Sequence, residues 1–356
     1  MFLALNEIRH SKLRYALVIG VTFLIAYLVF FLSGLAYGLA QQYQLAVNKW
    51  EATNILLSDK ANDNLAMSMI DPDAVNQVKA TDKAVLAQMP GIIFNIKDSD
   101  DKQNVSFFGI KQDEFLKPNV IEGKMFSAAG EVVADNSLKT RYKYQIGDKV
   151  KLATNNEALT IVGFTDNAKF SVAPVLYTSL DTFKTVRYGA ANAGQQKDLI
   201  NAIVTKGELT DKPDGLEKLT IAKFINVQPG YNAQVLTFSF MIGFLVVIAA
   251  VVIGIFIYVL TMQKVAIFGV MKAQGISSGY IARSVIAQTV ILSAGGVLCG
   301  LVATLASALV LPDAVPFQTN PMFLAGIGIL IVLVAILGAL FSVRSIVKID
   351  PLKAIG

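Results

Sequence analysis

The sequence predicts an α-helical membrane protein with four transmembrane helices and an α+β extracellular domain between helices one and two. Hydrophobic residues make up 54% of the chain and charged residues 16%, and the mean hydropathy is +0.54. Soluble domains average about 45–50% apolar and about 25% charged residues. Four uncharged stretches also reach the roughly 20 residues that a helix needs to cross a bilayer. An ordinary soluble enzyme is therefore excluded.

The chain starts with a predicted cytoplasmic amphipathic helix over residues 1–14. Apolar residues share one helical face of this segment, as in an interfacial helix: Phe2, Leu5 and Ile8. The next uncharged stretch, 15–40, predicts transmembrane helix 1. A cleaved signal peptide is the alternative, but its apolar region usually spans only about 7–15 residues. We therefore expect an uncleaved helix.

Residues 41–235 predict the extracellular α+β domain. Short runs rich in β-branched and aromatic residues predict strands: 105–110, 149–153, 159–164 and 219–224. A helix is expected over 180–188, with Ser179 as its N-cap. The segment contains no His and no Cys, which excludes serine–histidine and cysteine–histidine catalysis. Its pairs of adjacent acidic residues are interpreted as parts of solvated loops, and a role in acid–base catalysis is the alternative. A binding or coupling domain is therefore predicted.

Three further helices are predicted after this domain, at 236–262, 284–311 and 322–343. The connection 312–321 has no basic residue, whereas the connection 263–283 and the tail 344–356 have several. Basic residues near helix ends mark the cytoplasmic side. Both termini and the 263–283 connection are therefore predicted to be cytoplasmic, in a multi-pass plasma-membrane protein.

The formal charge of +5 is divided unevenly between the two parts of the chain. Residues 41–235 hold 22 of the 31 basic and 23 of the 26 acidic residues, a net of −1. The remainder holds 9 basic and 3 acidic residues, a net of +6. The basic excess therefore predicts contact with anionic lipid, and no nucleic-acid partner is expected.

The 263–283 connection predicts a coupling segment. Its apolar residues are interrupted by Gly269 and Gly275, which permit tight turns or close contacts. This pattern favours a short helix across the membrane face, offering an apolar ridge to a partner protein. An interfacial loop on lipid headgroups is the alternative. The chain also lacks a G-x-x-x-x-G-K-[ST] phosphate loop, so it is predicted to be a non-catalytic subunit driven by a separate ATPase.

Four stretches of this chain resemble the MacB/FtsX-type permeases of ABC transporters, and HrtB-type haem-efflux permeases in particular. They are Ile8 with Lys12-Leu13-Arg14-Tyr15, then Ser33-Gly-Leu-Ala36 with Gly38-Leu39, then Met262-Gln-Lys264 leading to Gly269-Val-Met-Lys-Ala273 and Gly275-Ile276, and finally Asp350-Pro-Leu-Lys-Ala-Ile-Gly356. The resemblance spans the whole chain, without the fused ATPase domain of MacB. It implies a Gram-positive permease homodimer with two HrtA-like ATPase subunits.

In such transporters the partner ATPase binds ATP and magnesium, and the permease has no cofactor of its own. The resemblance places the ATPase contact on six residues: Ile267, Phe268, Gly269, Met271, Lys272 and Gly275. Separately, Gly34-x-x-x-Gly38 in helix 1 permits close helix approach, so these glycines predict a dimer or helix-packing contact. Gly296-x-x-x-Gly300 in helix 3 permits the same.

The resemblance implies haem as the transported ligand. An exporter can collect this flat amphiphile laterally between helices one and two, and ferric iron accepts a Tyr ligand. Tyr231 is the expected ligand, and five further residues are expected to line the slot: Tyr37, Phe30, Phe31, Phe238 and Met241. Phe170 stands where haem-exporting relatives would have a second Tyr. Interfacial anchoring of these aromatic residues is the alternative.

Two other functions fit the same architecture. One is extrusion of a peptide, lipid or antibiotic. The other is FtsX-like signalling, in which no substrate moves and a shape change activates a cell-wall hydrolase. The outer domain of 195 residues is larger than signalling requires, which favours extrusion.

Overall fold

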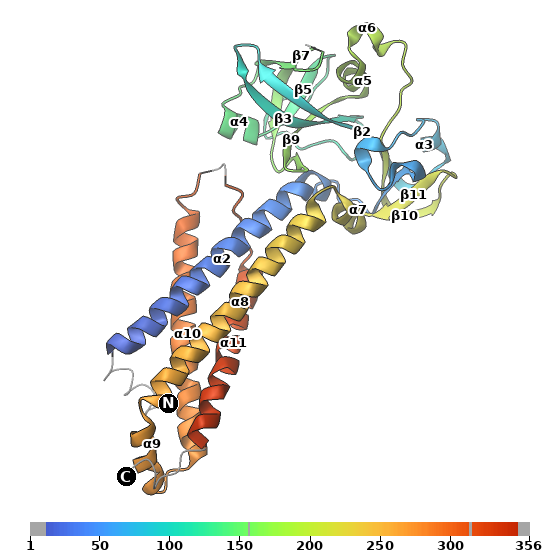
Figure 1. Ribbon diagram of the computed structural model, residues 1–356. Coiled ribbons are helices and arrows are strands. Elements are labelled where there is room, and N and C mark those ends of the chain that lie inside the picture. Colours follow the sequence, from blue (N-terminus) through green and yellow to red (C-terminus); the bar gives the residue numbers. More distant parts are fainter. Residues whose placement is uncertain (1–11, 156, 313–314, 348–356) are drawn as a thin grey trace. The chain divides into compact units, whose positions relative to one another are not determined.

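The computed structural model describes residues 12–155, 157–312 and 315–347, which form two compact units (Figure 1). The membrane unit consists of the described parts of Met1–Gly38 and Leu236–Gly356. The α+β domain is Leu39–Val235, close to the expected 41–235. Each unit is described separately below.

The membrane unit contains four helices long and apolar enough to cross a membrane. They are α2 (Lys12–Asn48), α8 (Tyr231–Met262), α10 (Ser278–Ala308) and α11 (Pro321–Val347). Both α2 and α8 continue beyond their expected spans into the α+β domain, where α2 ends and α8 begins. Residues 12–14 belong to α2, so only 1–11 of the expected amphipathic helix and 348–356 of the expected tail lie outside the described residues.

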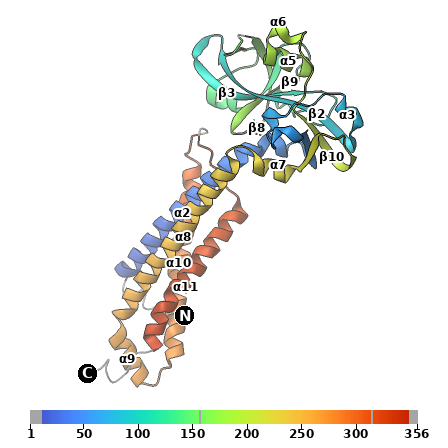
Figure 2. The same cartoon turned by 45° about the vertical axis from the view of Figure 1, so that its right-hand side comes forward.

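These helices run side by side in both views and approach through small residues (Figures 1 and 2). A Cβ atom added to Gly296 of α10 would lie 2.6 Å from the Thr22 Cβ atom of α2, and one on Gly300 would lie 2.9 Å from the Ala26 Cβ atom. On α11, a Cβ atom on Gly338 would lie 2.7 Å from a backbone oxygen of α8. Glycine at these positions therefore allows backbones to touch, as is common between membrane helices.

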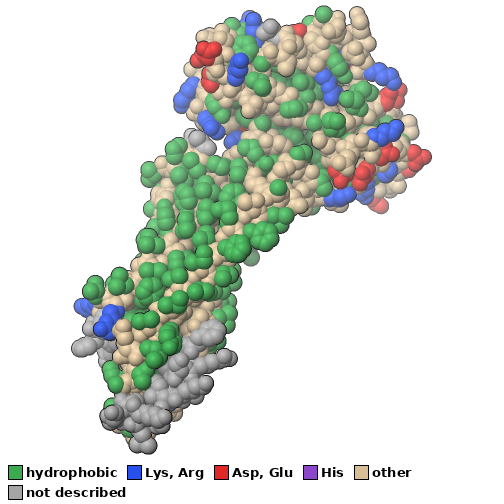
Figure 3. Space-filling view, in the orientation of Figure 1, with side chains coloured by type: hydrophobic (Ala, Val, Ile, Leu, Met, Phe, Trp, Pro, Cys, Tyr) green, Lys and Arg blue, Asp and Glu red, His purple; other side chains and the backbone are tan. Residues whose placement is uncertain are grey.

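Buried hydroxyl groups in this unit bond within their own helix. Each donates to the carbonyl oxygen four residues earlier at 2.6–2.9 Å: Thr22, Ser33, Thr261, Thr289, Ser293 and Thr304. Hydrocarbon offers no hydrogen-bond partner, so this pairing removes the cost of an unsatisfied group. Figure 3 shows the outer surface of the helices covered by hydrophobic side chains, with charged side chains at one end. This surface suits a lipid environment.

The α+β domain is built on an eleven-stranded sheet. Its main strand order is β11-β1-β10-β2-β3-β9-β5-β7-β4, with β6 between β2 and β7 and β8 on β9. Most pairs are antiparallel, and β3 with β9 and β5 with β7 are parallel. The strands are β1 (Asn54–Ser58), β2 (Lys79–Asn95), β3 (Asp98–Ile110), β4 (Glu122–Gly123), β5 (Glu131–Asp135), β6 (Lys149–Leu152), β7 (Ala158–Thr165), β8 (Lys169–Phe170), β9 (Ala173–Ser179), β10 (Ala202–Asp211) and β11 (Leu216–Thr220).

Short helices cover this sheet: η1 (Asp59–Ala61), η2 (Leu65–Met67), α3 (Ala74–Gln77), α4 (Ser137–Tyr142), α5 (Leu180–Tyr188), α6 (Ala190–Ala193) and α7 (Ile221–Val227). The expected helix over 180–188 is confirmed as α5, and the Ser179 hydroxyl caps it by accepting from the Thr182 amide. Three of the expected strands lie within β3, β6 and β7 apart from one end residue. The strand expected over 219–224 is wrong after Thr220, because Thr220 caps α7 through its hydroxyl.

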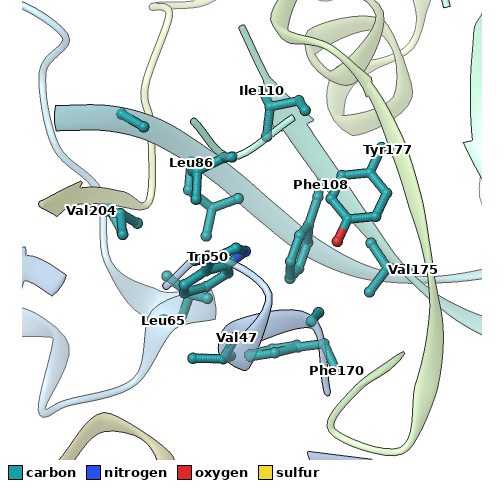
Figure 4. Close-up of a cluster of buried hydrophobic side chains, with 14 of the residues drawn as sticks. Val47, Trp50, Leu65, Leu86, Phe108, Ile110, Phe170, Val175, Tyr177 and Val204 are labelled. Atoms are coloured by element: carbon teal, nitrogen blue, oxygen red, sulfur yellow. The ribbon is translucent and has the colours of Figure 1, made fainter. Parts of the chain in front are cut away.

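The core of the α+β domain surrounds Trp50, which is 3% exposed (Figure 4). The Trp50 ring lies 6.1 Å from the Phe108 ring and 6.5 Å from the Phe224 ring. Val47, from the last turns of α2, joins the same cluster. The end of α2 is thus part of the domain's core, which ties the first long helix to the sheet through buried apolar surface.

Candidate coupling and cargo sites

The expected coupling segment contains a nine-residue helix, α9 (Val265–Ala273). A Schellman motif ends it: the Ile276 amide donates to the Met271 carbonyl and the Gly275 amide to the Lys272 carbonyl, both at 3.0 Å. Gly275 adopts φ +87°, a conformation that glycine reaches at little cost. Ser277 then caps α10 by accepting from the Tyr280 amide. Local bonds therefore fix the turn between α9 and α10 at both of its ends.

The two faces of α9 differ in burial. Phe268 is 2% exposed and packs with Ile253 and Ile257 of α8 and with residues of α10 and α11. Ile267 and Val270, in contrast, are 58% and 44% exposed. Neighbouring helical residues point about 100° apart, which separates an inward face from an outward one.

This burial divides the expected contact set between the two faces of α9. Phe268 and Gly269 lie inside the membrane unit, so they do not form an outward ridge. Met271 packs against the same cluster as Phe268, and Lys272 is half-buried. Of the six expected residues, only Ile267 and Gly275 are exposed. Val270, which the set omitted, completes the exposed apolar surface.

A buried polar group connects the start of α9 to two other helices. The Tyr15 hydroxyl of α2 is buried and accepts hydrogen bonds from the Lys264 ammonium, at 2.7 Å, and from the Gln288 amide of α10. Lys264 is the N-cap residue of α9, and its ammonium also lies 5.4 Å from the Tyr15 ring centre. The start of α9 is therefore hydrogen-bonded to α2, and the same hydroxyl group joins α2 to α10. Tyr15 and Gln288 are polar residues within or beside apolar stretches, which is a signal that could have identified this group.

The glycines of helix 1 pack against the loop before α11 in the same chain. A Cβ atom on Gly34 would lie 2.3 Å from the Phe317 ring, and one on Gly38 would lie 2.0 Å from the Pro316 carbonyl oxygen. The Gln318 amide also donates to the Gly34 carbonyl at 3.2 Å. These glycines, at which a dimer or helix-packing contact is expected, therefore pack closely within one chain, and the dimer contact stays a prediction.

The expected cargo residues are distributed over both units, with Tyr231 in the α+β domain and the other five in the membrane unit. Phe30, which was expected to line the slot, is fully buried among residues of α8, α10 and α11. Phe31 lies 5.5 Å from the Phe317 ring, and the Tyr37 hydroxyl accepts from the Asn320 amide at 3.3 Å. On α8, Phe238 is half-buried and Met241 is 43% exposed. These last two positions remain open to lipid.

Tyr231 belongs to the α+β domain as the first residue of α8. Its ring meets the Tyr43 ring edge-on at 5.6 Å and packs against the core cluster around Trp50. Phe170 lies in that cluster, 6% exposed, with its ring stacked 6.4 Å from the Phe224 ring. The second tyrosine expected in haem exporters is thus replaced here by a ring without a ligand atom.

Titratable groups of the α+β domain have structural roles. Backbone amides of Ser127 and Ala128 donate to the Glu131 carboxylate and, with Lys124, lower its pKa to about 2. Burial raises the pKa of Tyr144 to about 12. Among the described residues, no group of three or more His, Cys, Asp or Glu side chains is placed to hold a metal ion.

Comparisons with known proteins agree with this architecture. A family model described as the MacB-like periplasmic core domain matches residues 15–212, more than half of the chain. A second, described as FtsX-like permease C-terminal, matches residues 239–351. The chain belongs to the MacB/FtsX-type ABC transporter permeases. In this permease, the α+β domain between the first two membrane helices corresponds to the MacB-like core domain.

Full-length relatives of this permease have names that refer to transport. A protein of Staphylococcus haemolyticus and one of Staphylococcus epidermidis are provisionally named hemin transport system permease protein HrtB. They are 25% and 26% identical, covering 100% of this chain and 99% of each relative. An uncharacterised ABC transporter permease of Mycobacterium tuberculosis is 23% identical over the same shares.

Two solved structures were matched to part of this chain. The periplasmic region of MacB from Actinobacillus actinomycetemcomitans has a TM-score of 0.35 and 12% identity, and covers 48% of this chain and 89% of that one. The extracellular domain of the transporter YknZ from Gram-positive bacteria has a TM-score of 0.32 and 10% identity, and covers 47% of this chain and 99% of that one.

Proposed function

We propose that this permease exports haem from the membrane, using ATP hydrolysed by a separate HrtA-like subunit. The observation that supports it is the α9 helix, which presents Ile267 and Val270 outward while Phe268 is fixed in the membrane unit. A helix held in this way transmits force, because displacing it must move the helices that surround the Phe268 ring. The hemin names of full-length relatives support haem as the cargo.

Orientation and assembly are part of the proposal. Both termini and α9 lie in the cytoplasm of a Gram-positive cell, where the ATPase binds ATP and magnesium. Two permeases and two ATPases form the working unit, and closure of the ATPase pair pushes α9. The bond between Lys264 and Tyr15 then carries the movement to α2, and the packing of Phe268 carries it to α8 and α10.

Haem enters laterally from the lipid and uses Tyr231 as its iron ligand in this proposal. In the same proposal, Phe31 and Tyr37 of α2 and Phe238 and Met241 of α8 contact its apolar surface. Tyr is an established axial ligand of ferric haem.

The coupling step is tested by Ile267→Asp in the permease co-expressed with its ATPase. We expect loss of ATPase co-purification, because a carboxylate replaces an exposed apolar contact. Ile146→Asp is the matched control, since Ile146 is a 45% exposed isoleucine in the α+β domain. Equal recovery of the ATPase with both variants would contradict the assigned contact.

The cargo is tested by haemin tolerance and by absorbance. Deleting the gene should sensitise cells to haemin, and the purified permease should show a Soret band that Tyr231→Ala alters. Tyr280→Ala, at an exposed tyrosine of α10, should leave the band unchanged. Unchanged tolerance together with an unaltered spectrum would discard haem.

Phe170 supports a second candidate, the extrusion of a peptide, lipid or antibiotic. Its ring supplies no iron ligand, so Phe170 cannot serve as the second tyrosine of a haem clamp. An FtsX-like signalling role would instead give a cell-separation defect that no amphiphile relieves.

A further inference from the structure

A cavity of about 610 Å³ lies inside the α+β domain. Its walls come from the Asp63–Ala66 loop, from β2 and β3, from the turn between β8 and β9, and from the end of α7. This volume falls within the roughly 300–1,000 Å³ range of small-molecule sites. Apolar side chains form much of its surface: Leu65, Pro90, Ile92, Val105, Phe170 and Phe224.

Unpartnered polar atoms concentrate in the residues around this cavity. Among the described side chains, seven buried polar atoms lack a hydrogen-bond partner, and three belong to cavity-lining residues: Asp63 Oδ1, Gln88 Oε1 and Gln228 Nε2. Gln88 and Gln228 are each 4% exposed. A buried unpaired group costs about 1–3 kcal/mol, so three in one wall call for an explanation.

Both glutamines are held in place by their other amide atom. Gln88 Nε2 donates to the Ser106 hydroxyl at 3.0 Å, and the Ser171 hydroxyl donates to Gln228 Oε1 at 3.4 Å. Exchanging the oxygen and nitrogen positions of either side-chain amide would still leave one of its two polar atoms unpaired, so each glutamine has one atom available for a ligand. Together with Asp63, they can form hydrogen bonds with a ligand at the cavity wall.

Residues with a strained backbone lie in or beside the same cavity walls. Asp63 has φ +60°, and Ser171 has φ +48° beside Val172 at φ +72°. A positive φ is costly for a β-branched residue such as valine. Strain of this kind gathers at ligand clamps and binding loops.

The charge of the lining residues limits which ligands the cavity can bind. Asp63 is the charged residue of the lining, and no Lys or Arg contributes to it. The Lys223 ammonium lies 3.9 Å from the opposite oxygen of Asp63, outside the lining. A dianion such as haem meets no cation here, whereas an N–H donor or an ammonium group meets acceptors.

We propose that this cavity binds an uncharged or cationic peptide-like amide, with its apolar group on Phe170 and Phe224 and its N–H groups on Asp63 and Gln88. Tyr231 is not part of the lining, although it packs against the core cluster that contains Phe170 and Phe224. Binding in this cavity requires neither ATP nor the ATPase.

The test uses the full-length permease in lipid nanodiscs, without ATPase, and equilibrium dialysis of leucine β-naphthylamide. This probe combines an ammonium group, an amide and a flat ring. We expect saturable binding that empty nanodiscs lack, and about tenfold weaker binding by Asp63→Asn, since a charge-assisted hydrogen bond is lost. Gln88→Leu should weaken binding similarly. Asp59→Asn, at an exposed aspartate outside the lining, should bind as the unmodified permease does.

The matched anionic probe is N-succinyl-leucine β-naphthylamide, which should bind at least tenfold more weakly. Unaltered Trp50 emission identifies variants that remain folded, because this chain has one tryptophan and it lies in the domain core. Equal binding of both probes, unchanged binding by Asp63→Asn and Gln88→Leu, or no saturable binding would each overturn the proposal. In every case the haem-export tests stand independently, since they depend on Tyr231 and on ATP.

Discussion

The membrane unit and the α+β domain achieve stable packing by opposite means. Membrane helices meet through the absence of side chains, as at Gly296 and Gly338, where backbones touch. The α+β domain packs large rings instead, with Trp50, Phe108 and Phe224 at the centre of its core. In lipid, apolar burial provides little gain over contact with acyl chains, so close fit replaces bulk. We therefore expect added methyl groups at these glycine contacts to destabilise the membrane unit, and the loss of a large ring to destabilise the core of the α+β domain.

Single reporter residues allow the units to be followed separately. Trp50 is the one tryptophan and lies in the α+β domain, whereas Cys299 is the one cysteine and is exposed on α10. Trp50 emission therefore monitors one unit, and a fluorophore on Cys299 monitors the other.

The largest effect is expected from Phe268→Ala, the one large ring that α9 buries in the membrane unit. Removing a buried ring leaves a cavity and costs about 3–5 kcal/mol. The label on Cys299 should report a lower unfolding temperature, while the Trp50 transition stays in place. Ile267→Ala, at the exposed neighbour, should change stability by less than about 0.5 kcal/mol. Equal loss from both variants would show that Phe268 is not an anchor.

Gly296→Ala should destabilise the membrane unit by about 1–3 kcal/mol, because its methyl group would collide with Thr22. Gly295→Ala is the matched control, since a Cβ atom there meets nothing within 4 Å. That control should be neutral or slightly stabilising, because alanine favours helix over glycine by up to about 1 kcal/mol. Thermal unfolding of the Cys299-labelled permease measures both, and destabilisation by Gly295→Ala alone would refute the packing.

Tyr15→Phe removes one hydroxyl and keeps the ring. Lys264 and Gln288 each lose an acceptor, which should cost about 1–2 kcal/mol in the membrane unit. Export per ATP hydrolysed should fall further than stability does, because α9 loses its bond to α2. Tyr280→Phe, at an exposed position, is the control. An unchanged ratio of export to hydrolysis would remove Tyr15 from the coupling route.

The smallest effect concerns Glu131 in the α+β domain. Its pKa is lowered to about 2 from an ordinary 4.5, so its bonds stabilise the fold above pH 4.5. That contribution disappears as the pH falls from 4.5 through about 2. Trp50 emission should show a weaker acid dependence of unfolding in Glu131→Gln than in the unmodified permease over this interval. An identical dependence would assign acid sensitivity to other carboxylates.

Local patterns predicted local features well. Four apolar stretches indicated the four long helices, and Ser179 before Leu180 indicated α5 with its cap. The strand β2 escaped prediction because Pro90-Gly91 is typical of a turn, yet Pro90 pairs opposite Ser106 and the strand continues. A Cβ atom at Gly91 would approach the Phe107 ring to 2.7 Å, so this glycine serves packing rather than turning.

Contacts between segments that are far apart in the sequence could not be predicted from local patterns. The spacing of Gly34 and Gly38 predicted close packing, but it could not identify their partners within the chain, Phe317 and Pro316, which follow about 280 residues later. The sequence likewise indicated an apolar coupling segment without distinguishing Phe268, which is buried, from Val270, which is exposed. Only the helical phase of α9 relative to its neighbours makes that distinction.

The division of α9 into a buried and an exposed face has an evolutionary consequence. If α9 receives the ATPase as proposed, substitutions at Ile267 and Val270 would alter the contact surface, while Phe268 would preserve the attachment to the bundle. A duplicated gene of this kind could then acquire a new motor by drift at two surface positions, with its membrane architecture inherited intact.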